Sequence, residues 1–246
     1  MWQPDKSQGK ILPIGRLDFD GTEYSFRYVQ GIEEAMDAGF SRLPEFPELD
    51  EVYLSQDLFP VFANRLMSPR RPDFKAYVEH LGLRESEGNN FALQALDRSG
   101  GRTATDRFRV FLLPRPEDGK FVLRFFVAGV AHQDPDTVAQ LTNTIKPGEI
   151  LELQHEPGNK QDPDAIRILH GNEQLGYVPA QYATELRRLL PQNPGPICEV
   201  LQVNTPIARW TPDLLLVEVS TLWPENPEPF SDKSYQAFAN KNAVAI

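Results

Sequence analysis

The stretch EILELQHEPGNKQDPDAIRILHGNEQLGYV, from Glu149 to Val178, decides how the rest of this 246-residue sequence is interpreted. Leu151 and Leu153 alternate with polar residues, which is typical of a half-buried strand, and residues 165–168 indicate a second strand. Residues 156–164 between them are rich in Pro, Gly, Asn and Asp, so they predict a loop. A third short strand is expected at residues 175–178. The stretch therefore predicts strands that present one polar loop.

This stretch resembles the HIRAN domain, in which a Glu-Pro-x-Asn-x-x-Asp-x-x-Ala-Ile run precedes a Gly-Tyr-Val/Leu-Pro segment. The residues that match are Glu156, Pro157, Asn159, Asp162, Ala165, Ile166, Gly176, Tyr177, Val178 and Pro179. The resemblance covers about residues 121–223. It implies a small OB-like β-barrel and nucleic-acid binding, and strand-end binders of this family capture the 3′ end of single-stranded DNA.

Asn159 and Asp162 are the first candidate binding residues of the loop. An Asn side chain offers donors and acceptors to a base edge or a phosphate, and an aspartate accepts a hydrogen bond from a terminal sugar hydroxyl. Such an acceptor selects a strand end, because internal sugars have that oxygen esterified. The alternative is that both side chains bond to the loop's own backbone amides, as in Asx turns. The two roles are compatible.

The loop differs from strand-end binders of the family at the stacking positions. Gln161 stands where those proteins carry an aromatic residue, and Ala131 and His132 stand where they carry a basic residue and then an aromatic one. The rings of His132 and Tyr177 are candidates to replace these stacking surfaces. The alternatives are an ordinary exposed histidine and a tyrosine packed in the core. Gln161, His132 and Tyr177 complete the candidate site around this loop.

The N-terminal part begins with a predicted β-hairpin at residues 10–29, in which Asp20-Gly21 supplies the tight turn. An irregular connection follows at residues 31–51, and helices are expected from Gln56 to Leu66 and around residues 74–81. Residues 11–83 resemble the N-terminal segment of HipA-type toxins, which implies a module that docks a partner protein. The residues that carry this resemblance are Gly15, Leu17, Phe26, Tyr28, Leu43, Pro44, Leu58, Phe59, Pro60, Phe62, Asn64 and Leu66.

A basic cluster follows a short helix that is expected at residues 87–96. Its members are Arg98, Arg102, Arg107, Arg109 and Arg115. The Gly100-Gly101-Arg102-Thr103 loop is able to cradle a phosphate through backbone amides and a guanidinium. The alternative is a flexible connection to a strand expected at residues 108–112. Arg102 and Arg107 are therefore the candidate contacts to a phosphate backbone.

Composition limits the classes of function. The sequence has 25 Lys and Arg residues and 35 Asp and Glu residues, which gives a net charge of −10. This charge disfavours binding through non-specific neutralisation of phosphates, so a nucleic-acid site must be local. The single cysteine, Cys198, predicts a reducing, cytoplasmic location. We expect no metal, cofactor or membrane span, because no metal-site template and no long apolar run occurs. No catalytic motif occurs either, so we expect a protein that is not an enzyme.

These observations predict an α+β protein. Residues 1–115 form a mixed, HipA N-terminal-like docking domain, residues 120–223 an OB-like or SH3-like HIRAN β-barrel with two helices, and residues 224–246 a C-terminal tail. The expected function is non-catalytic nucleic-acid binding of bacterial type, directed at single-stranded DNA or DNA 3′ ends. The protein would recruit a helicase, nuclease or toxin–antitoxin partner in DNA repair or defence. The alternative is an adaptor that binds proteins and no DNA.

Overall fold

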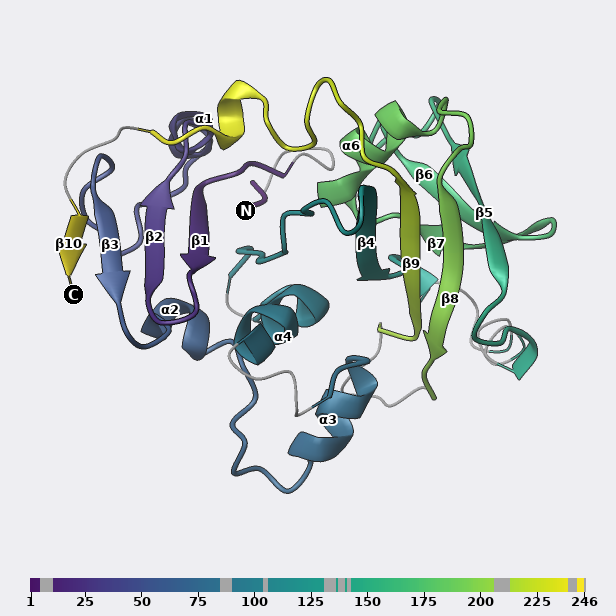
Figure 1. Ribbon diagram of the computed structural model, residues 1–246, viewed down its shortest axis with the longest axis horizontal. Coiled ribbons are helices and arrows are strands. Elements are labelled where there is room, and N and C mark those ends of the chain that lie inside the picture. The colour runs from purple at the N-terminus through teal and green to yellow at the C-terminus, as the bar shows by residue number, and fades with distance from the viewer. Residues whose placement is uncertain are drawn as a thin grey trace. The chain divides into compact units, whose positions relative to one another are not determined.

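The computed structural model describes the chain except residues 5–10, 85–89, 104–105, 131–135, 137–139, 141–142, 206–212, 239–242 and 246, and of Ala243–Ala245 it describes the backbone alone. The chain divides into two compact units. The first contains Met1–Glu79, Leu83–Leu112 and Phe230–Ile246, and the second contains His80–Gly82 and Leu113–Pro229. Figure 1 labels their helices and strands.

The first unit is built on a four-stranded sheet in the order β1-β2-β3-β10. Strands β1 (Gly15–Phe19) and β2 (Tyr24–Tyr28) pair in antiparallel fashion. Between them, the Asp20 carboxylate accepts hydrogen bonds from the backbone amides of Thr22 and Glu23, both at 2.8 Å. These bonds hold the turn, and the predicted hairpin is confirmed.

The other two strands of this sheet differ from the expectation. Strand β3 (Val52–Ser55), which the sequence did not predict, pairs antiparallel to β2. Strand β10 (Ala243–Ala245) pairs parallel to β3, although almost two hundred residues separate the two. The C-terminal segment from Phe230 onward thus belongs to the first unit, whereas we expected a separate tail.

Short helices and an aromatic core complete the first unit. The helices are α1 (Ile32–Asp37), α2 (Pro60–Ala63), α3 (Phe74–His80, whose last residue is assigned to the second unit), α4 (Phe91–Ser99) and the 3-10 helix η3 (Lys233–Tyr235). Phe46 is fully buried, and its ring stacks on that of Phe26 with centroids 4.1 Å apart. The helix expected at Gln56–Leu66 is reduced to the four residues of α2, and α1 lies in the connection expected to be irregular. The strand expected at residues 108–112 is wrong, because Phe108 makes an isolated bridge to Trp2.

The second unit is a six-stranded antiparallel sheet with one described helix. The strand order is β4-β9-β8-β5-β6-β7. The strands are β4 (Lys120–Phe126), β5 (Ile150–His155), β6 (Ile166–His170), β7 (Glu173–Tyr177), β8 (Ile197–Val203) and β9 (Leu215–Leu222), and the helix is α6 (Ala180–Leu189). Buried residues alternate with more exposed ones along β8, β5 and most of β4, as a sheet with one face on a core requires, while β9 begins with three consecutive buried residues.

The two edge strands of this sheet approach each other just beyond the end of β4. Ala128 and Tyr177 exchange two backbone hydrogen bonds, each 2.8 Å long, in an isolated bridge. A Cβ at Gly176 would lie 2.3 Å from the Ala128 carbonyl oxygen, so only glycine allows this approach. The ladder around the sheet is otherwise open, and the OB-like or SH3-like barrel stays a prediction. The second helix expected in this unit falls largely on residues outside the described part.

Helix α6 packs against the core of the second unit. Tyr182, Ala183, Leu186 and Leu189 are buried, and the Tyr182 ring lies 5.6 Å from that of Phe125 on β4. This packing fixes the helix next to the sheet and leaves Thr184 and Arg187 to reach the polar loop. Within the described ranges, no helix has both the length and the apolar character that a membrane crossing requires.

Candidate nucleic-acid interface

The polar loop Glu156–Asp164 connects β5 to β6 and is held by its own backbone. The Glu156 amide donates to the Ala165 carbonyl at 2.8 Å, and the Ala165 amide donates to the Asp162 carbonyl at 3.1 Å. The Asn159 amide donates to the Glu156 carbonyl at 3.0 Å. The loop is therefore a defined platform between two paired strands.

Asn159 organises the loop from inside. Its Oδ1 atom accepts hydrogen bonds from the backbone amides of Gln161, at 2.9 Å, and Asp162, at 3.1 Å. Its Nδ2 atom donates to Glu156 Oε2 at 2.7 Å. The Asx-turn interpretation is thus confirmed for the carbonyl oxygen, which has used both of its lone pairs. One N–H of the side-chain amide remains for a ligand.

The two carboxylate oxygens of Asp162 differ in their hydrogen bonding. Oδ1 accepts a hydrogen bond from the Asp164 amide at 2.8 Å. No described residue donates to Oδ2, which leaves an acceptor of the kind that a terminal sugar hydroxyl needs. Asp162 as a whole is half-buried.

Glu156 ties the loop to strand β7, a role that sequence reasoning missed. Its Oε2 atom accepts from Asn159 and, at 3.2 Å, from the phenol of Tyr177. Arg167 lies 3.9 Å from its other oxygen. The Asn159 hydrogen bond is the largest cause that lowers the pKa of Glu156. Burial opposes it, and the Tyr177 hydrogen bond and the charge of Arg167 lower the pKa further. Tyr177 is half-buried and its hydroxyl is occupied, which favours a supporting role for this ring.

The far end of the loop is anchored to α6. Asp164 Oδ1 lies 2.6 Å from Arg187 Nε, and Asp164 Oδ2 accepts a hydrogen bond from Thr184 Oγ1 at 2.7 Å. The His155 ring nitrogen lies 2.9 Å from the Pro163 carbonyl oxygen. These contacts fix both ends, so the segment between them is presented in one conformation.

The exposed tip of the loop consists of Gly158, Lys160 and Gln161. Lys160 was not singled out by sequence reasoning, and it makes no ion pair with a described residue. In the sequence it lies between Asn159 and the exposed Gln161. A cation between two amide side chains is the local signal that would have identified it. This tip supplies the charge that a phosphate contact needs.

The arginine candidates lie in the first unit, whereas the loop lies in the second. Arg102 and Arg107 are exposed, and Arg102 Nε donates to the Ser99 carbonyl at 3.0 Å. Their role as phosphate contacts stays a prediction. His132 lies outside the described residues. Among the described residues, no group of three or more His, Cys, Asp or Glu side chains is placed to hold a metal ion.

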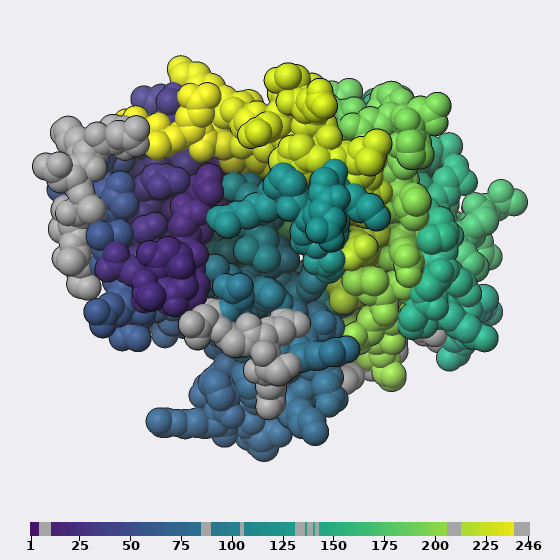
Figure 2. All heavy atoms as spheres, viewed as in Figure 1, coloured from purple at the N-terminus to yellow at the C-terminus, as the bar shows by residue number. Residues whose placement is uncertain are grey.

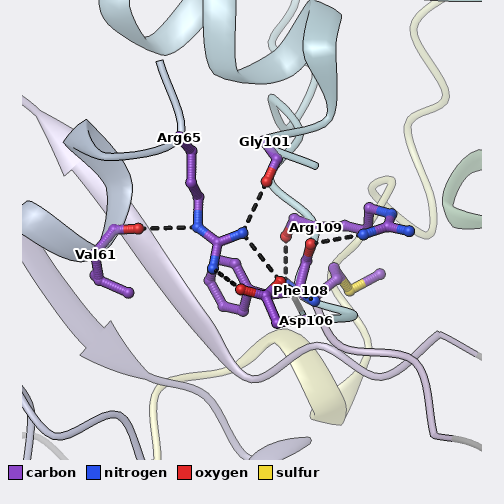
Figure 3. A network of polar contacts seen from close by, with 7 residues as sticks. Val61, Arg65, Gly101, Asp106, Phe108 and Arg109 are labelled. Carbon is purple, nitrogen blue, oxygen red and sulfur yellow. Dashed lines mark hydrogen bonds and ion pairs between the residues drawn. The ribbon is translucent and has the colours of Figure 1, made fainter. Parts of the chain in front are cut away.

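A nearly buried arginine organises the region of the first unit that contains this basic cluster (Figure 3). Arg65 donates to the Val61 and Gly101 carbonyls at 2.9 and 2.8 Å, and it forms a two-pronged pair with Asp106 at 3.1 and 2.6 Å. Its guanidinium lies 4.5 Å from the centre of the Phe108 ring. Sequence reasoning did not single out Arg65, which is not one of the five arginines of the predicted basic cluster.

Comparison with known proteins finds a family match within the second unit. A search of the curated proteins found no match. A search of the solved structures found the crystal structure of the HIRAN domain of human HLTF, which has 19% sequence identity and a TM-score of 0.30 and covers 42% of this chain and 79% of that chain. Residues 120–216 match the family model of the HIRAN domain. The resemblance to HipA-type toxins stays a prediction. The match to the family model supports a HIRAN domain at residues 120–216 of this chain, a span that contains the whole polar loop.

Proposed function

We propose that this chain is a non-catalytic nucleic-acid-binding protein that contacts single-stranded DNA or DNA 3′ ends through the loop Glu156–Asp164. The match of residues 120–216 to the HIRAN domain, which is known to bind DNA, carries this proposal. We further propose that the protein recruits a helicase, a nuclease or a toxin–antitoxin partner in DNA repair or defence.

The chemistry of the loop supports such a contact. Asn159 keeps one amide N–H, Asp162 keeps one carboxylate oxygen, and Lys160 places a positive charge beside them. The lysine and the amide suit a phosphate, while the carboxylate oxygen suits the hydroxyl of a terminal sugar. Because the loop's own bonds hold these groups in place, little ordering entropy opposes binding.

Fluorescence anisotropy of the full chain with short labelled DNA strands tests this function. We expect affinity that falls steeply as salt rises from about 50 to 200 mM, because phosphate contacts release counterions. We also expect tighter binding of strands with a 3′ hydroxyl than of strands with a 3′ phosphate, since only the hydroxyl is able to donate to Asp162. The absence of binding at the lowest salt would overturn the proposal.

The second candidate function is a protein-interaction adaptor without DNA binding. Two observations favour it. One side-chain oxygen of Asn159 and one of Asp162 accept hydrogen bonds from the loop's own backbone amides, and the net charge of the chain is −10. In this case the polar groups of the loop have a structural role, and the anisotropy of labelled DNA stays unchanged at every salt concentration. The same titration therefore separates the two functions.

A further inference from the structure

Residues 230–238, which we call the strap, lie along the backbone of residues 28–31 in the first unit. Val29 and Ala237 form an isolated antiparallel bridge, and main-chain hydrogen bonds of 2.9 to 3.0 Å join the residues on either side of it. Figure 1 shows the strap in yellow beside α1, and in Figure 2 its atoms form part of the visible surface. The strap is therefore held as one strand is held by another.

Two aromatic side chains anchor the ends of the strap. Phe230 is 6% exposed, and the centre of its ring lies 5.8 Å from that of Phe111 and 5.4 Å from that of Tyr235. Phe238 packs against the aromatic core of the first unit. The structure thus shows which segment covers this surface and through which contacts.

The strap and the strand that precedes it belong to different units. Strand β9 ends at Leu222 in the second unit, and residues 223–229 lead from it to the strap in the first unit. This linker contains three prolines in seven residues, which makes it a semi-rigid spacer. The bridge and the main-chain bonds involve the strap and residues 28–31 alone, so the strap of a second copy of the chain is able to make the same contacts.

The first residue of the strap holds a strained backbone conformation. Phe230 has a φ of 54°, which lies in the left-handed region that an aromatic residue rarely adopts. This angle sets the direction in which the linker enters the strap of its own chain. A strap that is exchanged with a second copy is entered from another direction, so the exchange is able to release the strain.

We propose that two copies of this chain exchange their straps, so that residues 230–238 of each copy bind along residues 28–31 of the other. A segment linked to its own site has an effective concentration on the order of 1 mM. The closed monomer therefore dominates in dilute solution, and the exchanged dimer grows with protein concentration. The dimer joins two copies of the second unit, and its formation does not depend on whether the loop Glu156–Asp164 binds DNA.

Disulfide trapping between two variants of the full chain tests the exchange. The variants are Val29→Cys and Ala237→Cys, because opposed residues of an antiparallel bridge have the Cα separation that a disulfide requires. Val29 is 2% exposed, so a thiol there meets the strap and is shielded from random collisions. We expect an equimolar mixture, incubated at about 1 mM and then oxidised, to give a disulfide-linked heterodimer. Absence of the heterodimer would overturn the proposal.

Two controls separate this crosslink from others. Lys233→Cys places a thiol on an exposed residue of the same strap that does not oppose Val29, so its mixture with Val29→Cys gives no heterodimer. Val29→Cys alone reports any disulfide with the natural Cys198, which is buried. An equal yield of heterodimer from Lys233→Cys would contradict the exchange.

The strain at Phe230 gives the dimer a second signature, which light scattering measures. We expect a dimer of the wild-type chain whose share rises with concentration. In Phe230→Gly the closed monomer is no longer strained, because glycine adopts a positive φ readily, and the association constant falls at least about tenfold. Phe238→Ala removes an anchor from the closed and the exchanged form alike, so the constant stays within about threefold of the wild type. A monomer at every concentration, or equal losses in the two variants, would overturn the proposal.

Discussion

The carboxylate of Glu156 accepts a hydrogen bond from the phenol of Tyr177 at 3.2 Å, and this bond joins the first residue of the polar loop to the last residue of β7. The same oxygen accepts from Asn159 at 2.7 Å. Two segments that carry the resemblance to the HIRAN domain, Glu-Pro-x-Asn and Gly-Tyr, thus meet at one carboxylate. Several of these residues shape the loop, and its exposed tip is left to meet a ligand.

The order of the loop depends on pH through Glu156. Its folded-state pKa is lowered below the ordinary value of 4.5, so the stabilisation is complete above pH 4.5 and is lost as pH falls through the folded pKa. We expect the amide signals of Gln161 and Asp162 to lose their folded-state NMR shifts in this acidic window. Glu156→Gln is the control, because it removes the titrating group. The same acid transition in Glu156→Gln would show that another group is responsible.

Asn159 is expected to matter through two different atoms. Asn159→Ala removes both the acceptor for the Gln161 and Asp162 amides and the donor to Glu156, so hydrogen exchange of those two amides accelerates at least about tenfold. Asn159→Asp keeps the acceptor but places a second carboxylate beside Glu156. We therefore expect Asn159→Asp to protect the two amides at neutral pH less than the wild type and more than Asn159→Ala. Identical exchange in the three proteins would contradict the Asx-turn role.

Gly176 permits the bridge between Ala128 and Tyr177. In Gly176→Ala the new Cβ would lie 2.3 Å from the Ala128 carbonyl oxygen and 2.8 Å from Val127 Cγ1. We expect a loss of about 2 kcal/mol in the free energy of unfolding, typical of overpacking, and faster hydrogen exchange of the Ala128 and Tyr177 amides. Gly158→Ala is the matched control, because a Cβ there meets no atom within 4 Å. Unchanged exchange in Gly176→Ala would contradict this explanation of the glycine.

Arg65 stabilises the first unit. Its side chain is 7% exposed and joins Val61, Gly101 and Asp106. Arg65→Met leaves these acceptors without their donor, and we expect a loss of about 2 kcal/mol in urea-induced unfolding. Arg71→Met removes an exposed arginine that pairs with Asp73, and it changes stability by less than about 0.5 kcal/mol. The prediction fails if the two variants unfold at the same urea concentration.

The sequence predicted those features that local pattern encodes. Alternation and the Asp20-Gly21 turn were sufficient for the β1–β2 hairpin, and the loop composition was sufficient for Glu156–Asp164. The pairing of β10 with β3 was not predictable, because nothing local to residues 243–245 specifies a partner so far along the chain. The strand expected from Phe108 failed for a similar reason, since a buried apolar residue does not require a ladder.

The sequence predicted where the candidate site lies, but it predicted only part of the chemistry of its side chains. Asn and Asp in a loop predicted both ligand contacts and Asx turns, and the structure assigns Oδ1 of each side chain to the turn. The role of Glu156 depends on the contact between the loop that follows β5 and the end of β7, which sequence spacing does not reveal. The exposure of Lys160 likewise follows from the loop's internal bonds rather than from its neighbours in sequence.

The affinity of short single-stranded DNA for Lys160→Glu, measured by anisotropy beside Lys120→Glu, tests most directly whether the loop contacts nucleic acid. Both lysines are exposed residues of the second unit, and the two substitutions change the net charge by the same amount. We predict that Lys160→Glu weakens binding about tenfold at low salt and lowers the slope of log affinity against log salt by about one, the value for one phosphate contact. We predict that Lys120→Glu stays within about twofold of the wild type. Equal effects of the two substitutions, or none, would contradict the account.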